Sequence, residues 1–133
     1  MAHDVLHPSG WKPARGYANG IAARGRLVFT GGMIGWTEDC VFETDDFAGQ
    51  AAQALRNIVA VLAEGGAGPE HLVRLTWYVT DKRAYLDSLR DLGRAYRDII
   101  GPHYPAMALV QVVALVEDRA LVEIEATAVV PEA

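Results

Sequence analysis

The spacing of hydrophobic residues separates two helical segments from the rest of the chain. From Asp46 to Glu64, apolar residues recur with the 3.6-residue period of an α-helix. Asp45 or Asp46 can cap the start of this helix, and Gly65-Gly66 predicts where it stops. The same period predicts a second amphipathic helix from about Lys82 to Ile100.

The remaining hydrophobic positions follow the two-residue period of β-strands. Leu72 to Thr80 alternates strictly, which is typical of a strand with two different faces. The short connection Arg24-Gly25-Arg26 predicts a hairpin between the first two strands. The other predicted strands cover residues 17–23, 27–30, 106–115 and 120–130. Residues 1–15 contain Pro8 and Gly10 and are expected to be irregular.

The resulting element order, ββαβαββ, predicts an α+β fold. Both helices follow strands, so a single mixed sheet with the two helices on one face is the economical arrangement. A chain of 133 residues is long enough for one core and too short for two. Residues 1–133 are therefore expected to form one domain.

The second face of this sheet is expected to mix apolar residues with carboxylates. Alternation places Leu109, Val113 and Leu121 there, beside Glu123 and Glu125. The composition is also 51% hydrophobic, more than a small domain with a solvated surface requires. Because an open surface of this kind is unfavourable, the pattern predicts a symmetric homo-oligomer with clefts where subunits meet.

Charge and cysteine content narrow the functional classes. The net charge is −5, from 12 Lys and Arg against 17 Asp and Glu, which disfavours binding to a phosphate backbone. The single cysteine cannot form an internal disulfide, and no Cys/His spacing indicates metal ligands. No signal-peptide pattern and no apolar run of about 20 residues is present. We therefore expect a cytoplasmic protein with no metal, nucleic acid or membrane partner.

Two carboxylates on the last predicted strand are the first candidates for chemistry. Glu123 and Glu125 are two residues apart, so their side chains share a face with Cβ atoms about 7 Å apart. A carboxylate at a subunit boundary can have a raised pKa and act as general acid and base toward a bound water. Alternatively, both are solvated, or paired with a cation such as Arg74 across the sheet.

Several loop residues are further candidates. The run from Thr30 to Gly35 either presents backbone N–H groups to an anion or is a plain loop, and it lacks nucleotide-binding spacing. His103 precedes a strand, where a side chain can line a site or be exposed. Trp36 can stack on a ligand or fill an interface. Cys40 lies among acidic residues and is interpreted as a bystander.

Five short segments together resemble the RidA/YjgF family of enamine and imine deaminases, over about residues 16–130. The segments are Leu27-Val28-Phe29-Thr30-Gly31-Gly32, Ala63-Glu64-Gly65-Gly66, Val73-Arg74-Leu75-Thr76-Trp77-Tyr78-Val79-Thr80-Asp81, Tyr104-Pro105-Ala106 and Leu121-Val122-Glu123-Ile124-Glu125-Ala126-Thr127-Ala128. The resemblance implies a chorismate-mutase-like fold, assembled as a homotrimer with three sites in the clefts between subunits.

The resemblance also implies a chemistry without metal or cofactor, the hydrolysis of a reactive enamine or imine to a carbonyl compound and ammonia. Glu123 matches the glutamate that positions the attacking water and transfers protons. Tyr17 matches a tyrosine of the cleft, and Gly31, a position usually occupied by serine, lies against the substrate. The expected substrate-binding residues are Tyr17, Gly31, Gly32, Trp36, His103 and Met107.

The sequence departs from the family pattern at Met107, the position of an arginine that clamps the substrate carboxylate. A thioether cannot replace these charge-assisted hydrogen bonds, which are worth about 1.5–3 kcal/mol. We therefore predict a substrate other than 2-aminoacrylate, such as a 2-aminomuconate-like compound, with Met107 and Trp36 as apolar contacts and His103 or Arg15 as a polar one. The alternative is a trimer that binds a small metabolite without catalysis. An RNA-binding role conflicts with the acidic charge balance.

Overall fold

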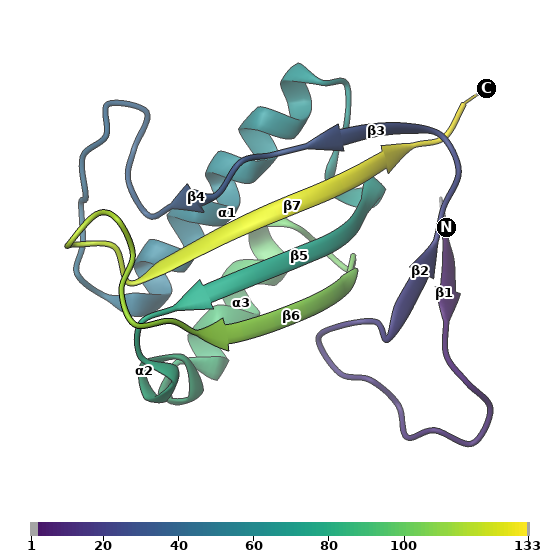
Figure 1. Cartoon of the computed structure of the whole chain (residues 1–133), viewed down its shortest axis with the longest axis horizontal. Coiled ribbons are helices and arrows are strands. Elements are labelled where there is room, and N and C mark those ends of the chain that lie inside the picture. The colour runs from purple at the N-terminus through teal and green to yellow at the C-terminus, as the bar shows by residue number, and fades with distance from the viewer. Residues whose placement is uncertain (1–2, 133) are drawn as a thin grey trace.

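The computed structural model describes residues 3–132, and its main sheet has five strands (Figure 1). Their bounds are Arg26–Phe29 (β3), Met33–Ile34 (β4), Leu72–Val79 (β5), Ala106–Gln111 (β6) and Val122–Val130 (β7). The strand order is β3, β7, β5 and β6, and β4 also pairs with β7. β5 and β6 are parallel to each other, whereas β7 is antiparallel to each of its three partners, β3, β4 and β5. The predicted mixed α+β fold is therefore confirmed.

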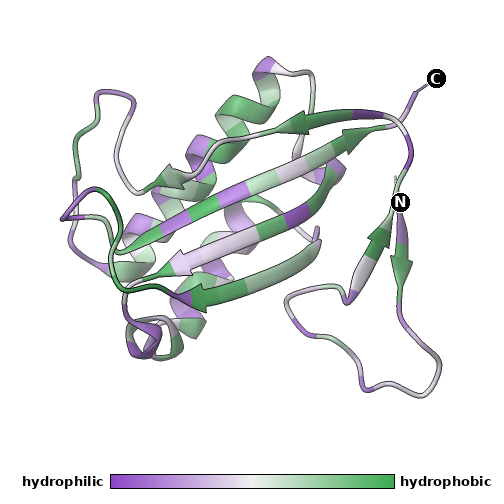
Figure 2. Cartoon of the chain, in the orientation of Figure 1, coloured by the Kyte–Doolittle hydropathy of each residue, from purple (hydrophilic) through white to green (hydrophobic). Residues whose placement is uncertain are grey.

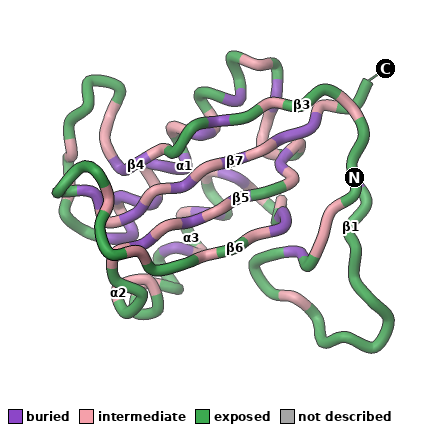
Figure 3. The backbone as a smooth tube through the Cα atoms, viewed as in Figure 1, coloured by how far each residue is buried: buried purple, intermediate pink, exposed green. Residues whose placement is uncertain are grey.

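The helices lie on one side of the main sheet, behind it in Figure 1. They are α1 (Phe47–Glu64), α2 (Lys82–Asp87) and α3 (Leu89–Ile99), and a short 3-10 helix, η1 (Pro69–His71), precedes β5. The core fills the space between the helices and the sheet, where buried segments alternate with exposed ones along each element (Figure 3). Its largest fully buried side chains are Gln50, Leu55, Ile58, Leu62, Leu75, Val79, Val122 and Ile124.

The two predicted helices have different outcomes. The first is α1, and its N-cap is Asp46, whose Oδ2 accepts a hydrogen bond from the Gly49 N–H at 2.9 Å. The second is corrected, because the segment expected from Lys82 to Ile100 is two helices that meet at Ser88. The Ser88 hydroxyl donates to the Ala84 carbonyl oxygen at 2.7 Å. This side-chain bond takes the acceptor that the Ser88 N–H would need in a continuous helix.

The predicted hairpin between the first two strands is wrong. Residues Gly20–Ala22 (β2) pair with Asp4–Leu6 (β1) in a separate two-stranded sheet, so residues 1–15 are not wholly irregular either. In Figure 1 this ribbon projects beside the main sheet. The backbone at Gly25 passes so close to the end of β7 that a Cβ there would lie 2.0 Å from the Val130 carbonyl oxygen. The connection therefore carries the chain onto the edge of the main sheet instead of reversing it.

The face assignment of β6 is also corrected. The strand ends at Gln111, so Val113 lies beyond it. Leu109 pairs in register with the buried Trp77 and therefore lies on the helix side of the sheet. Parity along one strand tells which residues share a face, but the pairing with β5 decides which face it is. The exposed apolar residues on the open face are Leu27, Phe29 and Val110, on the two strands that are mainly green in Figure 2.

Candidate functional site

A β-bulge at Gly31 and Gly32 forms the base of the candidate site. Phe29 pairs with Thr127 and Met33 pairs with Ile124, so three residues of one strand face two of the other. Thr30 holds the start of the bulge, because its N–H donates to the Ala126 carbonyl oxygen at 2.9 Å. A bulge of this kind bends the strand and redirects neighbouring side chains, and such bulges are frequent next to active sites.

The carboxylate of Glu123 lies directly on this bulge. Glu123 pairs with Ile34, just past the bulge, and its side chain turns back over Gly32. A Cβ at Gly32 would lie 2.0 Å from Glu123 Oε2, so a glycine there leaves the space that the carboxylate fills. Within residues 3–132, no hydrogen bond or ion pair engages this carboxylate. It is half-buried and available to a ligand on the open face.

Glu125 has a different environment, although it lies on the same face. Its Oε1 accepts a hydrogen bond from the Tyr78 hydroxyl at 2.9 Å. This hydrogen bond is the main reason that the pKa of Tyr78 is raised, and partial burial and the charges of Glu125 and Glu123 add to it. Arg74 forms no ion pair with either glutamate in the part of the chain that the structure describes. Of the two carboxylates, Glu123 is therefore the free one.

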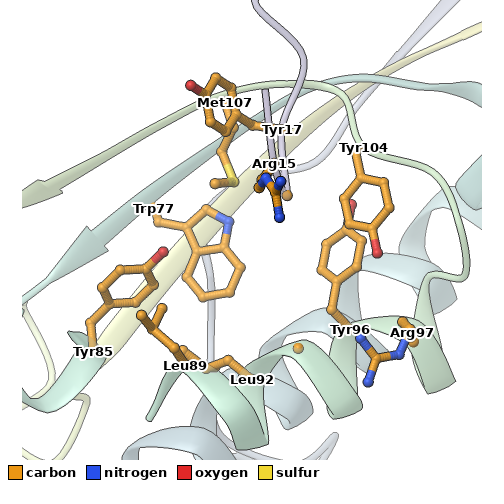
Figure 4. A pocket seen from close by; sticks show the side chains of 12 residues that line it. Arg15, Tyr17, Trp77, Tyr85, Leu89, Leu92, Tyr96, Arg97, Tyr104 and Met107 are labelled. Atoms are coloured by element: carbon orange, nitrogen blue, oxygen red, sulfur yellow. The ribbon is translucent and has the colours of Figure 1, made fainter. Parts of the chain in front are cut away.

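A cavity of about 440 Å³ lies on the opposite side of the sheet, between its β6 edge and helices α2 and α3. Met107 lines it from β6, and Arg15 and Tyr17 line it from the segment that leads into β2. Tyr17 is held there because the next residue, Ala18, donates its N–H to the Pro105 carbonyl oxygen at 2.9 Å. Figure 4 shows this cavity from close by, with aromatic side chains on both sides of it.

A single chain does not bring Met107 and Glu123 together. Met107 is in register with the fully buried Leu75, so it belongs to the helix side of the sheet. Glu123 is in register with Tyr78, which belongs to the open side. The two side chains therefore point away from opposite faces of the same sheet.

Known proteins resemble this chain over most of its length. The family model described as Endoribonuclease L-PSP matches residues 9–130. A RutC family protein from Synechocystis is 33% identical over 121 residues, covering 90% of this chain and 89% of that protein. TdcF from Escherichia coli, named as a reactive intermediate deaminase, is 30% identical over 116 residues, 85% of each chain. The chain belongs to the RidA/YjgF family.

Solved structures of RidA/YjgF proteins have the same fold. YyfB from Yersinia pestis, a Rid-family protein, superposes with a TM-score of 0.86 at 27% identity, over 98% of this chain and 100% of that one. The Escherichia coli TdcF structure with bound serine gives a TM-score of 0.68 at 28% identity, over 93% of each chain. The RidA/YjgF fold therefore accounts for nearly the whole molecule.

Two of the expected site residues, His103 and Trp36, do not line the 440 Å³ cavity in the described chain. The backbone oxygen of His103 accepts a hydrogen bond from the Tyr96 hydroxyl, but the His103 side chain is not part of the cavity. The Trp36 ring packs on Phe42 with centroids 5.7 Å apart, in a depression beside Cys40.

The described residues also bear on other site types. Over residues 3–132, no group of three or more His, Cys, Asp or Glu side chains is placed to hold a metal ion. In the same range, no helix has both the length and the apolarity needed to cross a membrane. Cys40 is an exposed free thiol.

The aromatic lining of the cavity was not identified from the sequence. Tyr85 and Tyr96 have the spacing of a buried helical stripe, and that pattern is the same whether a tyrosine borders a cavity or fills a core. Arg97 looks like one of several surface cations on this helix. The one available signal was the concentration of tyrosines between residues 78 and 104, which is dense for a domain with five tyrosines in all.

Proposed function

We propose that this protein hydrolyses a reactive enamine or imine to a carbonyl compound and ammonia, with Glu123 as the general acid and base. The observation that carries the proposal is the Glu123 carboxylate, which lies on the Gly32 backbone with no protein partner among the described residues. The name of the relative TdcF, a reactive intermediate deaminase, supports the same class of reaction.

The proposed reaction needs only water and one proton-transferring group. Glu123 accepts a proton from a water molecule as the water oxygen adds to the carbon of the protonated imine, which gives a tetrahedral carbinolamine. The protonated Glu123 then delivers that proton to the nitrogen, and the C–N bond breaks so that ammonia leaves. The Glu123 carboxylate takes the proton of the carbinolamine hydroxyl as the carbonyl forms. An enamine first gains a proton at its β-carbon and then follows the same route. No electrons are transferred, so the proposal includes no redox cofactor.

The complete site is proposed to lie between two copies of the chain in a homotrimer. Glu123 and the Gly31–Gly32 bulge contribute the catalytic half from one copy. Tyr17 and Met107 contribute the binding half from the neighbouring copy, because they occupy the other side of their own sheet. The exposed apolar residues Leu27 and Phe29 on the open face support burial between copies.

Met107 sets the proposed substrate apart from 2-aminoacrylate. Its thioether offers no hydrogen-bond donor to a carboxylate, and it borders a wide, largely aromatic cavity. A larger substrate, such as a 2-aminomuconate-like compound, uses that space better than a three-carbon enamine does. An endoribonuclease activity, as in the family description, receives no support from the charge, because −5 opposes the approach of a phosphate backbone.

The decisive experiment measures ammonia release from a panel of imines generated in situ from several amino acids. Glu123→Gln is expected to lower the rate by at least about 100-fold, the range of a lost general acid and base. Glu125→Gln, the matched variant two residues along the same strand, is expected to keep most of the activity. Wild-type protein that turns over no imine, or a Glu123→Gln rate equal to wild type, would refute the enzyme and favour the non-catalytic metabolite binder.

A further inference from the structure

The indole N–H of Trp77 is a buried donor without an acceptor. The Trp77 side chain is 4% exposed, and its Nε1 has no hydrogen-bond partner among the described residues. Trp77 also lines the 440 Å³ cavity. Most buried tryptophan N–H groups have a partner, because an unmet donor is costly. Because Trp77 lines this cavity, its unpaired indole N–H is the donor that an acceptor atom of a bound ligand would meet.

The walls of the cavity suit a flat apolar group. Tyr96 and Tyr104 are stacked, with ring centroids 5.1 Å apart and planes inclined by 14°. Trp77 and Tyr85 meet edge to face, with centroids 6.4 Å apart. Figure 4 shows these two pairs on either side of the cavity, with Leu89 and Leu92 along α3 between them. Offset and edge contacts of this kind favour an aromatic ring over a polar chain.

Arginine is the only charged residue type that lines the cavity in the described chain. Arg15 and Arg97 contribute to the lining, no aspartate or glutamate does, and neither arginine forms an ion pair within residues 3–132. A guanidinium group binds a carboxylate through paired hydrogen bonds, and such bonds are the strong ones. In a protein with a net charge of −5, two uncompensated arginines at one cavity favour an organic anion.

The glycine in the middle of α3 keeps this space open. Gly93 lines the cavity, and a Cβ there would meet only the Arg97 side chain, at 3.8 Å. No contact in the described structure requires a glycine at this position, and glycine inside a helix costs about 0.5–1 kcal/mol relative to alanine. The cavity therefore extends over α3, where a larger residue would reduce its volume.

We propose that this cavity binds an aromatic carboxylate that carries a carbonyl or imine acceptor. The ring lies between Trp77 and the two stacked tyrosines, the acceptor meets Trp77 Nε1, and Arg15 and Arg97 bind the carboxylate. This inference rests on the proposed function where it names a substrate. If the protein hydrolyses imines, the substrate class is an imine of an aromatic amino acid or a similarly flat unsaturated acid. Arg15 and Arg97 then take the place of the arginine that Met107 replaces.

Binding of phenylpyruvate to the full-length protein, measured by calorimetry, tests the proposal. Phenylpyruvate has the aromatic ring, the carbonyl acceptor and the carboxylate that the proposal requires. The neutral analogue 4-phenyl-2-butanone and the ringless pyruvate are both expected to bind at least tenfold more weakly. Arg97→Gln and Arg15→Gln are each expected to weaken phenylpyruvate binding by about tenfold or more, the size of a lost charge-assisted hydrogen bond. They should leave binding of the neutral analogue within twofold.

Matched variants separate loss of the site from loss of the fold. Arg94→Gln removes an exposed arginine one turn earlier on α3, and Trp11→Phe changes an exposed tryptophan; both should bind phenylpyruvate as wild type does. Trp77→Phe should weaken binding by removing the donor. Gly93→Leu should abolish phenylpyruvate binding. The Gly93→Ala protein should remain folded and bind phenylpyruvate more weakly than wild type does.

The result distinguishes this proposal from the proposed reaction. Glu123→Gln should bind phenylpyruvate normally while losing ammonia release. If phenylpyruvate, pyruvate and the neutral analogue bind alike, or if both arginine variants bind as wild type does, the ligand class is wrong. Ammonia release from imines would then still stand on its own. Selective phenylpyruvate binding without turnover of any imine would uphold the ligand class and refute the reaction.

Discussion

Gly32 and Glu123 show how one small residue can fix the position of a functional group. Both residues match the RidA/YjgF pattern, and they are 91 positions apart in the sequence. Their contact depends on β4 pairing with β7 and on the extra residue at the bulge. Neither feature has a sequence signature stronger than two adjacent glycines, so the residue types were predictable and the contact was not.

Gly32→Ala is expected to impair catalysis with little effect on stability. The added Cβ would lie 2.0 Å from Glu123 Oε2, and the flexible carboxylate would move rather than the backbone. A displacement near 1 Å costs about 100-fold in rate in a well-positioned site. The comparison variant is Gly31→Ala, whose Cβ meets no atom within 4 Å and should leave Glu123 in place. Steady-state rates and thermal melts of both variants provide the check, and equal losses would contradict this role for Gly32.

Among the secondary-structure elements, α3 links the fold to the cavity. The break at Ser88 separates it from α2, and its Tyr96 packs on the core while the Tyr96 hydroxyl donates to the His103 backbone oxygen. The sequence predicted the helical period and its end at Gly101-Pro102, because those depend on local spacing and glycine. It did not predict the break, because a serine hydroxyl inside a helix usually leaves the helix continuous.

Two tyrosines, the half-buried Tyr85 of α2 and the buried Tyr96 of α3, predict a loss of stability at alkaline pH. Burial raises the pKa of Tyr96 and the pKa of Tyr85 above the ordinary tyrosine value of 10.0. Above about pH 10 the unfolded chain loses these protons while the folded chain keeps them, so the free energy of unfolding falls as the pH rises. Chemical denaturation between pH 8 and 11 should show this decline, and Tyr96→Phe should make it shallower. A decline of equal slope in both proteins would contradict the assignment.

At the scale of the whole molecule, one chain leaves large apolar side chains exposed on two surfaces. Phe29 is 64% exposed and Leu27 is 56% exposed on the open face of the sheet. The β1–β2 ribbon has no hydrophobic core of its own, and Val5 and Leu6 are about half exposed. Isolated two-stranded ribbons are marginally stable in water. These surfaces are consistent with association between copies, which we have proposed as a homotrimer.

Phe29→Asp is expected to convert the proposed trimer to monomers. A carboxylate buried between copies without a partner costs several kcal/mol, enough to lower the association constant by more than about 100-fold. Val61→Asp, at an exposed apolar position on α1, serves as the control and should remain trimeric. Sedimentation velocity at micromolar concentration measures the outcome. A wild-type protein that is monomeric at this concentration would refute the assembly.

Subunit mixing tests whether the site is shared between copies. Glu123→Gln and a variant with a blocked cavity, Gly93→Leu, should each be inactive alone. Co-expressed in equal amounts, they should recover about a quarter of the wild-type rate, because each boundary has an even chance of receiving each intact half. No recovery from stable mixed trimers would place both halves of the site in one chain.

The sequence by itself determined the local features of this protein. Hydrophobic period, capping residues and glycine stops specified α1 and the strands β5 and β7, because these signals act over a few neighbouring residues. The family pattern identified Glu123, Gly31, Gly32 and Met107 as candidate site residues.

Tertiary structure alone decided how those parts face one another. Pairing between distant strands placed Met107 on the helix side and Glu123 on the open side of the sheet. It also gave β2 the partner β1 in place of β3, the partner that the sequence had predicted. It also buried Trp77 Nε1 without a partner and brought Trp77, Arg15 and Arg97 to the lining of one cavity. A one-residue change of register moves every side chain of a strand to the other face, and no local pattern records which register the whole sheet adopts.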